Sequence, residues 1–73
     1  MEESEIKERL RAADPEFRRL SEDHQRLDSR LAELAGRPFL NETDMLLEKD
    51  LKKQKLVLKD KMYAIMNAFL KSI

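Results

Sequence analysis

The stretch FRRLSEDHQRLDSRL, residues 17–31, decides the fold of this 73-residue chain. Its large apolar residues are Phe17, Leu20, Leu27 and Leu31, and His24 fills the gap so that intervals of three and four alternate. Residues with this spacing lie along one side of an α-helix, as they do in the seam of a coiled coil. The stretch therefore predicts a helix whose apolar seam contains one polar residue, the single histidine of the chain.

The same spacing continues beyond the stretch, to Ile6, Leu10 and Ala13 on one side and to Leu34 on the other. Asp14 and Pro15 interrupt it with a helix start, because aspartate caps a helix and proline is favoured at its first position. We therefore expect a main helix over about 15–35 and a short helix over about 4–13 before it. Since the spacing is unbroken, the short helix is expected to stay roughly in line with the main one.

A second long helix is expected over about 42–71. Gly36 and Pro38 stand where residues that end a helix are common, and Asn41 is placed to cap the next one. The apolar seam of this second helix consists of Leu47, Leu51, Gln54, Leu58, Met62, Ile65, Phe69 and Ile73. Its spacings follow an 11-residue period, which indicates a nearly straight helix.

Each seam contains one polar residue, and an antiparallel hairpin would bring the two together. Folding the chain about a turn near residue 39 places Leu27 opposite Leu51 and His24 opposite Gln54. Such a polar layer would fix the register, because a slip would bury each polar group against leucine. The charges agree, since residues 1–36 carry a net −3 and residues 37–73 a net +3. We predict an all-α fold, an antiparallel helical hairpin forming a single domain over residues 1–73.

The composition argues against several classes of function. Charged residues make up 41% of the chain with a formal net charge of zero, which is typical of long solvated helices. The absence of cysteine excludes disulfides and thiolate metal sites, and one histidine cannot build a zinc site alone. A ligand or pH-sensing role for His24 at a contact between chains, near Glu22, Asp23 and Asp28, is the alternative to its structural role.

The sequence also offers no catalytic machinery. No serine or cysteine has a positioned base, and a narrow two-helix seam has no concave pocket. We therefore expect a protein that is not an enzyme, without catalytic, cofactor-binding or metal-binding residues. No apolar run approaches the roughly 20 residues that span a bilayer, and the acidic start MEESEIKERL does not resemble a signal peptide. A cytoplasmic protein without a membrane partner is expected.

The C-terminal part of the second helix is more apolar than one seam requires. A second apolar stripe consists of Leu56, Tyr63, Met66, Leu70 and Ile73. A helix that is apolar over most of its circumference is buried on two sides, and a chain of this size gains stability by oligomerising. The stripe therefore predicts a homo-oligomer, a dimer first of all, in which two hairpins form a helical bundle. The alternative occupant is a helix of another protein.

The second helix is also rich in lysine, at Lys49, Lys52, Lys53, Lys55, Lys59 and Lys61. One interpretation is a solvent-exposed helix face on which the lysines pair with acidic residues. The other is a set of phosphate contacts for a weak nucleic-acid-binding protein. The zero net charge and the lack of interleaved aromatic residues argue against the second interpretation. We therefore predict a non-catalytic, self-associating coiled-coil interaction module, with nucleic-acid binding as the alternative.

Three short motifs stand out, namely Asp-Pro-x-Phe at residues 14–17, His-x-x-Leu-Asp at residues 24–28, and the run LKKQKLVLKD at residues 51–60. Together they resemble the YdcH-like family of small bacterial proteins. The resemblance extends over about residues 5–66. It implies a short helical hairpin or coiled coil, and it brings no established activity and no catalytic residue.

Overall fold

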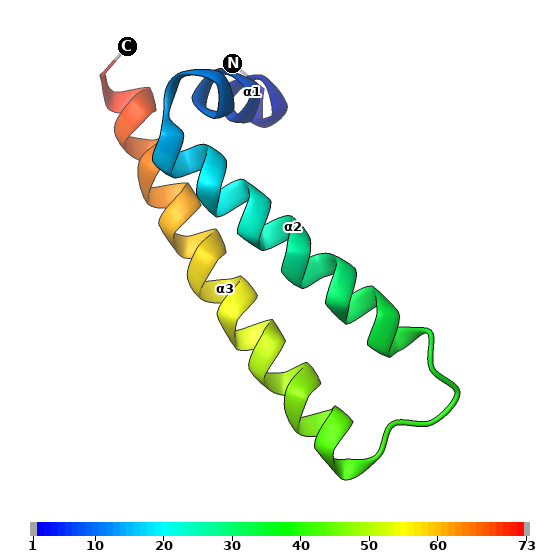
Figure 1. Cartoon of the computed structure of the whole chain (residues 1–73). Helices are drawn as coiled ribbons and strands as arrows, with labels where there is room; N and C mark the ends of the chain where they lie inside the picture. Colours follow the sequence, from blue (N-terminus) through cyan, green and yellow to red (C-terminus); the bar gives the residue numbers. More distant parts are fainter. Residues whose placement is uncertain (1, 73) are drawn as a thin grey trace.

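The protein is an antiparallel helical hairpin with a third, short helix packed on it (Figure 1). The computed structural model describes residues 2–72. The helices are α1 (Glu3–Ala13), α2 (Pro15–Ala35) and α3 (Glu42–Lys71). The described residues contain no strand, so the predicted all-α hairpin is confirmed, with helix bounds within one residue of those expected. The molecule is 48 Å long, close to the length of α3 itself.

The two long helices begin at the predicted caps. The Asp14 side chain accepts hydrogen bonds from the backbone N–H groups of Glu16, at 2.9 Å, and Phe17, at 3.2 Å. The Asn41 side chain accepts one from the backbone N–H of Asp44, at 2.8 Å. Each bond satisfies a donor that the first helical turn leaves without a partner. The helix starts could therefore be located from local sequence signals alone.

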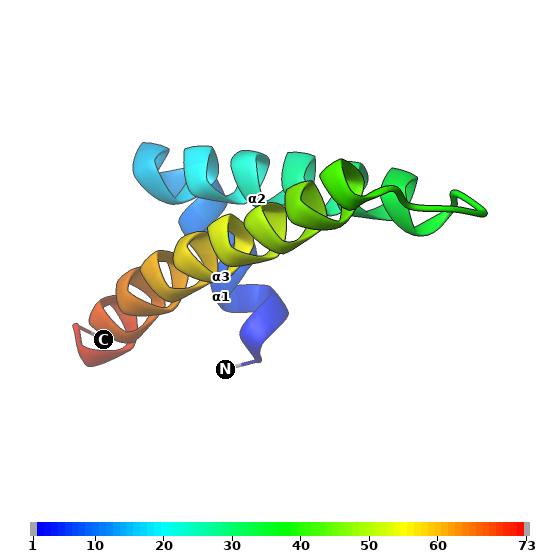
Figure 2. The same cartoon turned by 90° about the horizontal axis from the view of Figure 1, so that it is seen from below.

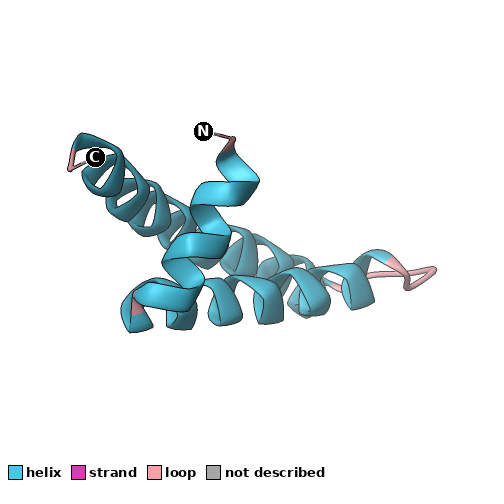
Figure 3. Cartoon of the chain, turned by 90° about the horizontal axis from the view of Figure 1, so that it is seen from above, coloured by secondary structure: helices cyan, strands magenta, loops and turns pink. Residues whose placement is uncertain are grey.

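The predicted in-line continuation of α1 and α2 is wrong. Figures 2 and 3 show α1 lying across the open end of the hairpin instead of extending α2. Asp14 between them is extended, with φ −115° and ψ 107°, because a residue that precedes proline is disfavoured in the helical region. The chain turns there, and Ala13, which the seam pattern placed in the core, is exposed. The extended backbone conformation of Asp14 thus sets the direction of α1.

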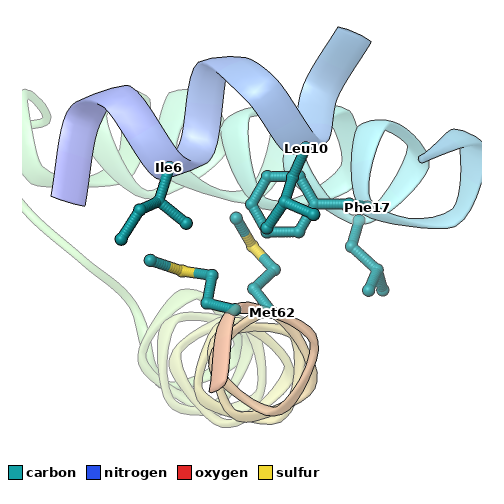
Figure 4. Close-up of a cluster of buried hydrophobic side chains, with 6 residues drawn as sticks. Ile6, Leu10, Phe17 and Met62 are labelled. Atoms are coloured by element: carbon teal, nitrogen blue, oxygen red, sulfur yellow. The ribbon is translucent and has the colours of Figure 1, made fainter. Parts of the chain in front are cut away.

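The core consists of two apolar clusters along the hairpin. The cluster at the open end contains Ile6, Leu10, Phe17, Leu20, Met62 and Met66, drawn from all three helices. Figure 4 shows Ile6 and Leu10 pointing from α1 toward Met62 of α3. The cluster nearer the turn is built on Leu27, Leu34 and Leu51, so the predicted neighbours Leu27 and Leu51 do pack together. Partly buried Leu58 borders both clusters and makes the core continuous.

Candidate functional site

The predicted polar layer of His24 and Gln54 does not form. Gln54 is exposed and its amide donates a hydrogen bond to Asp50, at 2.7 Å, along its own helix. His24 is partly buried, and its Nδ1 lies 3.6 Å from a carboxylate oxygen of Asp28. The reason is the rotation of α3, which turns Lys55 toward α2 in place of Gln54. Lys55 bonds to Asp28, and this ion pair is the polar contact that joins the two long helices near their middle.

The Asp28–Lys55 pair changes the acid–base behaviour of the carboxylate. The hydrogen bond and positive charge of Lys55 lower the pKa of Asp28 below its usual value, with a smaller contribution from His24. A carboxylate with a lowered pKa in the folded state stabilises the fold above its unfolded pKa of about 3.9. This contribution is lost as the pH falls through the lower, folded value. The pair is half exposed, so its effect on stability is small.

We expect the Lys55→Gln substitution to raise the pKa of Asp28 toward its ordinary value, because the substitution removes the donor charge. NMR titration of the Asp28 carboxyl carbon measures this shift directly. Lys52→Gln is the matched control, since Lys52 pairs with Glu48 on its own helix, at 3.4 Å. If Lys52→Gln raised the pKa of Asp28 as much as Lys55→Gln does, the shift would reflect the summed positive charge of α3 and not the contact with Lys55.

Three residues of the predicted self-association surface are exposed on α3. The exposed fractions are 58% for Leu56, 38% for Tyr63 and 42% for Leu70. They follow one another at intervals of seven residues, nearly two full helical turns, so they lie on one side of the helix. We call these three residues the Tyr63 stripe. It is a row of large apolar side chains that the protein's own core does not use.

Two other residues of that predicted surface do not belong to the stripe. Met66 is buried, with 4% of its surface exposed, in the cluster at the open end. The sequence pattern could not reveal this, because it is α1 that covers Met66 and α1 was expected elsewhere. Ile73 lies outside the described residues. Tyr63 stands beside α1, since its hydroxyl donates to a carboxylate oxygen of Glu3, at 3.1 Å.

The six lysines of α3 that were predicted as phosphate contacts do not all share one face. Successive residues on an α-helix are turned by about 100°, so Lys61 points nearly opposite to Lys59. Lys52 and Lys55 are held by carboxylates, Glu48 and Asp28. The Lys59 ammonium lies 5.9 Å from the centroid of the Tyr63 ring. Lys49 and Lys53 lie on a third side, so the predicted phosphate contacts do not form a continuous track.

A polar cleft opens where α1 crosses the hairpin. It has a volume of about 630 Å³ and residues of all three helices line it, so we call it the three-helix cleft. Its lining is Glu3, Lys7, Arg11, Ser21, His24, Gln25, Asp28, Lys55, Lys59, Met62, Tyr63 and Met66. The sequence interpretation missed this site because it expected α1 to lie in line with α2. The available signal was the four-residue spacing of Glu3, Lys7 and Arg11, which places them on one face.

Two features of the three-helix cleft stand out chemically. The Lys7 ammonium lies 3.2 Å from Glu3, and this contact with the Tyr63 hydrogen bond lowers the pKa of Glu3. The Ser21 hydroxyl oxygen is buried and has no hydrogen-bond partner in the part of the chain that the structure describes. An unpaired buried hydroxyl costs about 1–3 kcal/mol. The cleft thus combines positive charge with a hydroxyl that lacks a partner.

Neither a metal site nor a membrane span is found in residues 2–72. No group of three or more histidine, aspartate or glutamate side chains in this range is arranged to hold a metal ion. None of the helices in this range combines the length and the apolar character needed to cross a bilayer.

The fold and its surfaces define a small α-helical hairpin protein with a crossing N-terminal helix. The chain belongs to a family described as "Protein of unknown function (DUF465)", whose model matches residues 17–66. This finding is consistent with the resemblance to YdcH-like proteins. The matched segment covers most of α2, the turn and most of α3, and it begins after α1. Comparisons with curated proteins and with solved structures gave no match.

Proposed function

We propose that the protein is a non-catalytic helical interaction module that self-associates into a dimer through the Tyr63 stripe. The observation that carries this proposal is the exposure of Leu56, Tyr63 and Leu70 along one side of α3. Apolar residues that recur every seventh position occupy one of the two core positions of a coiled-coil heptad. Packing α3 of one chain on α3 of a second would bury this row and produce a bundle of two hairpins.

The size of the chain supports a second copy as the occupant. A chain of 73 residues buries a smaller share of its surface on folding than a larger domain does, so it gains more from oligomerisation. The stripe lies on the longest helix, so two copies can align over several turns. A helix of another protein is the alternative occupant, and the oligomeric state separates the two. A cytoplasmic location remains a prediction from the sequence.

Sedimentation equilibrium of the purified chain at micromolar concentration tests the proposal. We expect the mass of a dimer, because burying the stripe removes three large apolar side chains from water on each chain. A folded monomer at every concentration would overturn self-association and leave the stripe to another protein.

Nucleic-acid binding is less favoured by the arrangement of the lysines. Phosphate backbones are bound by cations that follow one groove or face. Here Lys52 and Lys55 are paired with carboxylates, and Lys61 faces away from Lys59. Lys49 and Lys53 have no ion pair within residues 2–72, but two lysines on one side of α3 are too few for an extended phosphate contact.

A further inference from the structure

The three-helix cleft has the dimensions of a small-molecule site. Its volume of about 630 Å³ lies within the range of roughly 300–1,000 Å³ that is usual for ligand pockets. It exists because α1 crosses the hairpin and adds Glu3, Lys7 and Arg11 to residues of α2 and α3. The cleft shares Tyr63 with the Tyr63 stripe, and neither Leu56 nor Leu70 lines it.

The cleft carries more positive than negative charge in a chain whose formal net charge is zero. Four cationic residues line it, namely Lys7, Arg11, Lys55 and Lys59, against the two carboxylates of Glu3 and Asp28. Both carboxylates are already engaged, Glu3 by Lys7 and Asp28 by Lys55. Arg11 and Lys59 therefore remain without an ion pair anywhere in residues 2–72.

The cleft also holds a hydrogen-bond donor that lacks a partner. Ser21 belongs to the lining, and its buried hydroxyl makes no hydrogen bond with any described residue. Buried polar groups in folded proteins are nearly always satisfied, and an exception requires an explanation such as a bound ligand. A rotation of the Ser21 side chain would present this hydroxyl to an anion in the cleft, and the anion would also compensate the two unpaired cations.

We propose that the three-helix cleft binds the phosphate group of a small phosphorylated molecule. A phosphate carries close to two negative charges at neutral pH and three acceptor oxygens, which match one arginine, one lysine and one hydroxyl. Arg11 supplies paired donors suited to phosphate oxygens, and Lys59 supplies a compact charge. Ser21 donates the third hydrogen bond. The site is a local cleft at the crossing of three helices, so it accommodates a small ligand better than an extended polymer.

Isothermal titration calorimetry with pyrophosphate, at low salt, tests this proposal on the full chain. We expect saturable binding of one ligand per chain. Arg11→Gln and Lys59→Gln should each weaken binding by about tenfold or more, because each removes a charged hydrogen-bond donor. Ser21→Ala should weaken it by a smaller factor, since a neutral donor is lost. Circular dichroism checks that each variant is folded.

The matched controls are Arg18→Gln and Lys61→Gln. Both residues are exposed and lie outside the cleft, yet their substitution changes the net charge equally. Unchanged binding in these controls would support a defined site. Equal weakening in cleft and control variants, or the absence of saturable binding at millimolar pyrophosphate, would overturn it. A single-stranded RNA that binds more tightly than pyrophosphate at equal phosphate concentration, and that Lys61→Gln weakens, would overturn the small-molecule assignment in favour of nucleic acid.

Discussion

Replacing Phe17 with alanine should destabilise the protein by about 3–5 kcal/mol. Phe17 is fully buried, with 0% of its surface exposed, at the point where the three helices meet. Its ring contributes to the cluster that holds α1 against the hairpin, so truncation leaves a cavity lined by Ile6 and Leu10. An 11-residue helix such as α1 is not stable alone and depends on this packing.

Thermal unfolding followed by circular dichroism measures the effect. A domain of this size has a total stability of roughly 4–11 kcal/mol, so the variant should lose a large part of it. Each kcal/mol lowers the Tm of a domain this small by about 4–8 °C. Phe39→Ala is the matched control, because Phe39 is 87% exposed in the turn. It should change stability by less than about 0.5 kcal/mol. Equal Tm values for the two variants would contradict the described docking of α1.

The hairpin itself could be predicted because its signals are local. Asp14 and Asn41 cap the long helices, and the residues that form the cluster near the turn recur at helical spacing. Each of these features depends on residues within a few positions of one another. Fold class and helix bounds therefore follow from the sequence without knowledge of tertiary contacts.

The direction of α1 could not be obtained from the same signals. An unbroken spacing of apolar residues from Ile6 to Phe17 is compatible with one straight seam. It is equally compatible with two helices that bury their apolar faces in different directions. The extended backbone at Asp14 decides between these arrangements. Because this crossing creates the three-helix cleft, the cleft was missed together with it.

The rotation of α3 is a second feature that the pattern could not reveal. Gln54 falls in the apolar register and was expected to face His24, but Lys55 faces α2 instead. A lysine can cover an apolar seam with its aliphatic stem while its ammonium reaches a carboxylate. An apolar-spacing pattern treats lysine as polar and exposed. It therefore assigns the position facing α2 to Gln54, although Lys55 occupies it. Long side chains of this kind limit register prediction from apolar spacing alone.

Replacing Leu56 with glutamate should dissociate the proposed dimer. Leu56 is 58% exposed at one end of the Tyr63 stripe, so a charge is solvated there in the monomer and would be desolvated in the dimer. Each dimer contains two copies of the substitution, and in a symmetric interface both are affected. We expect the free energy of dimerisation to weaken by about 2 kcal/mol or more, which raises Kd roughly 30-fold or more. Sedimentation equilibrium over a concentration series measures this loss.

The adjacent substitution Val57→Glu separates loss of the interface from a general effect of added charge. Val57 is 47% exposed and carries the same change in net charge, but it is turned by about 100° from Leu56 around α3. We expect Val57→Glu to remain a dimer with the unfolding temperature of the unsubstituted protein. Leu56→Glu should stay helical by circular dichroism, while its unfolding temperature falls because the dimer is lost. If Val57→Glu dissociated and Leu56→Glu did not, the interface would lie on the neighbouring face of α3. Leu56 belongs to the Tyr63 stripe and Val57 does not, whereas both substitutions add the same negative charge. Dissociation of both variants would therefore indicate that net charge, and not burial of the Tyr63 stripe, controls association.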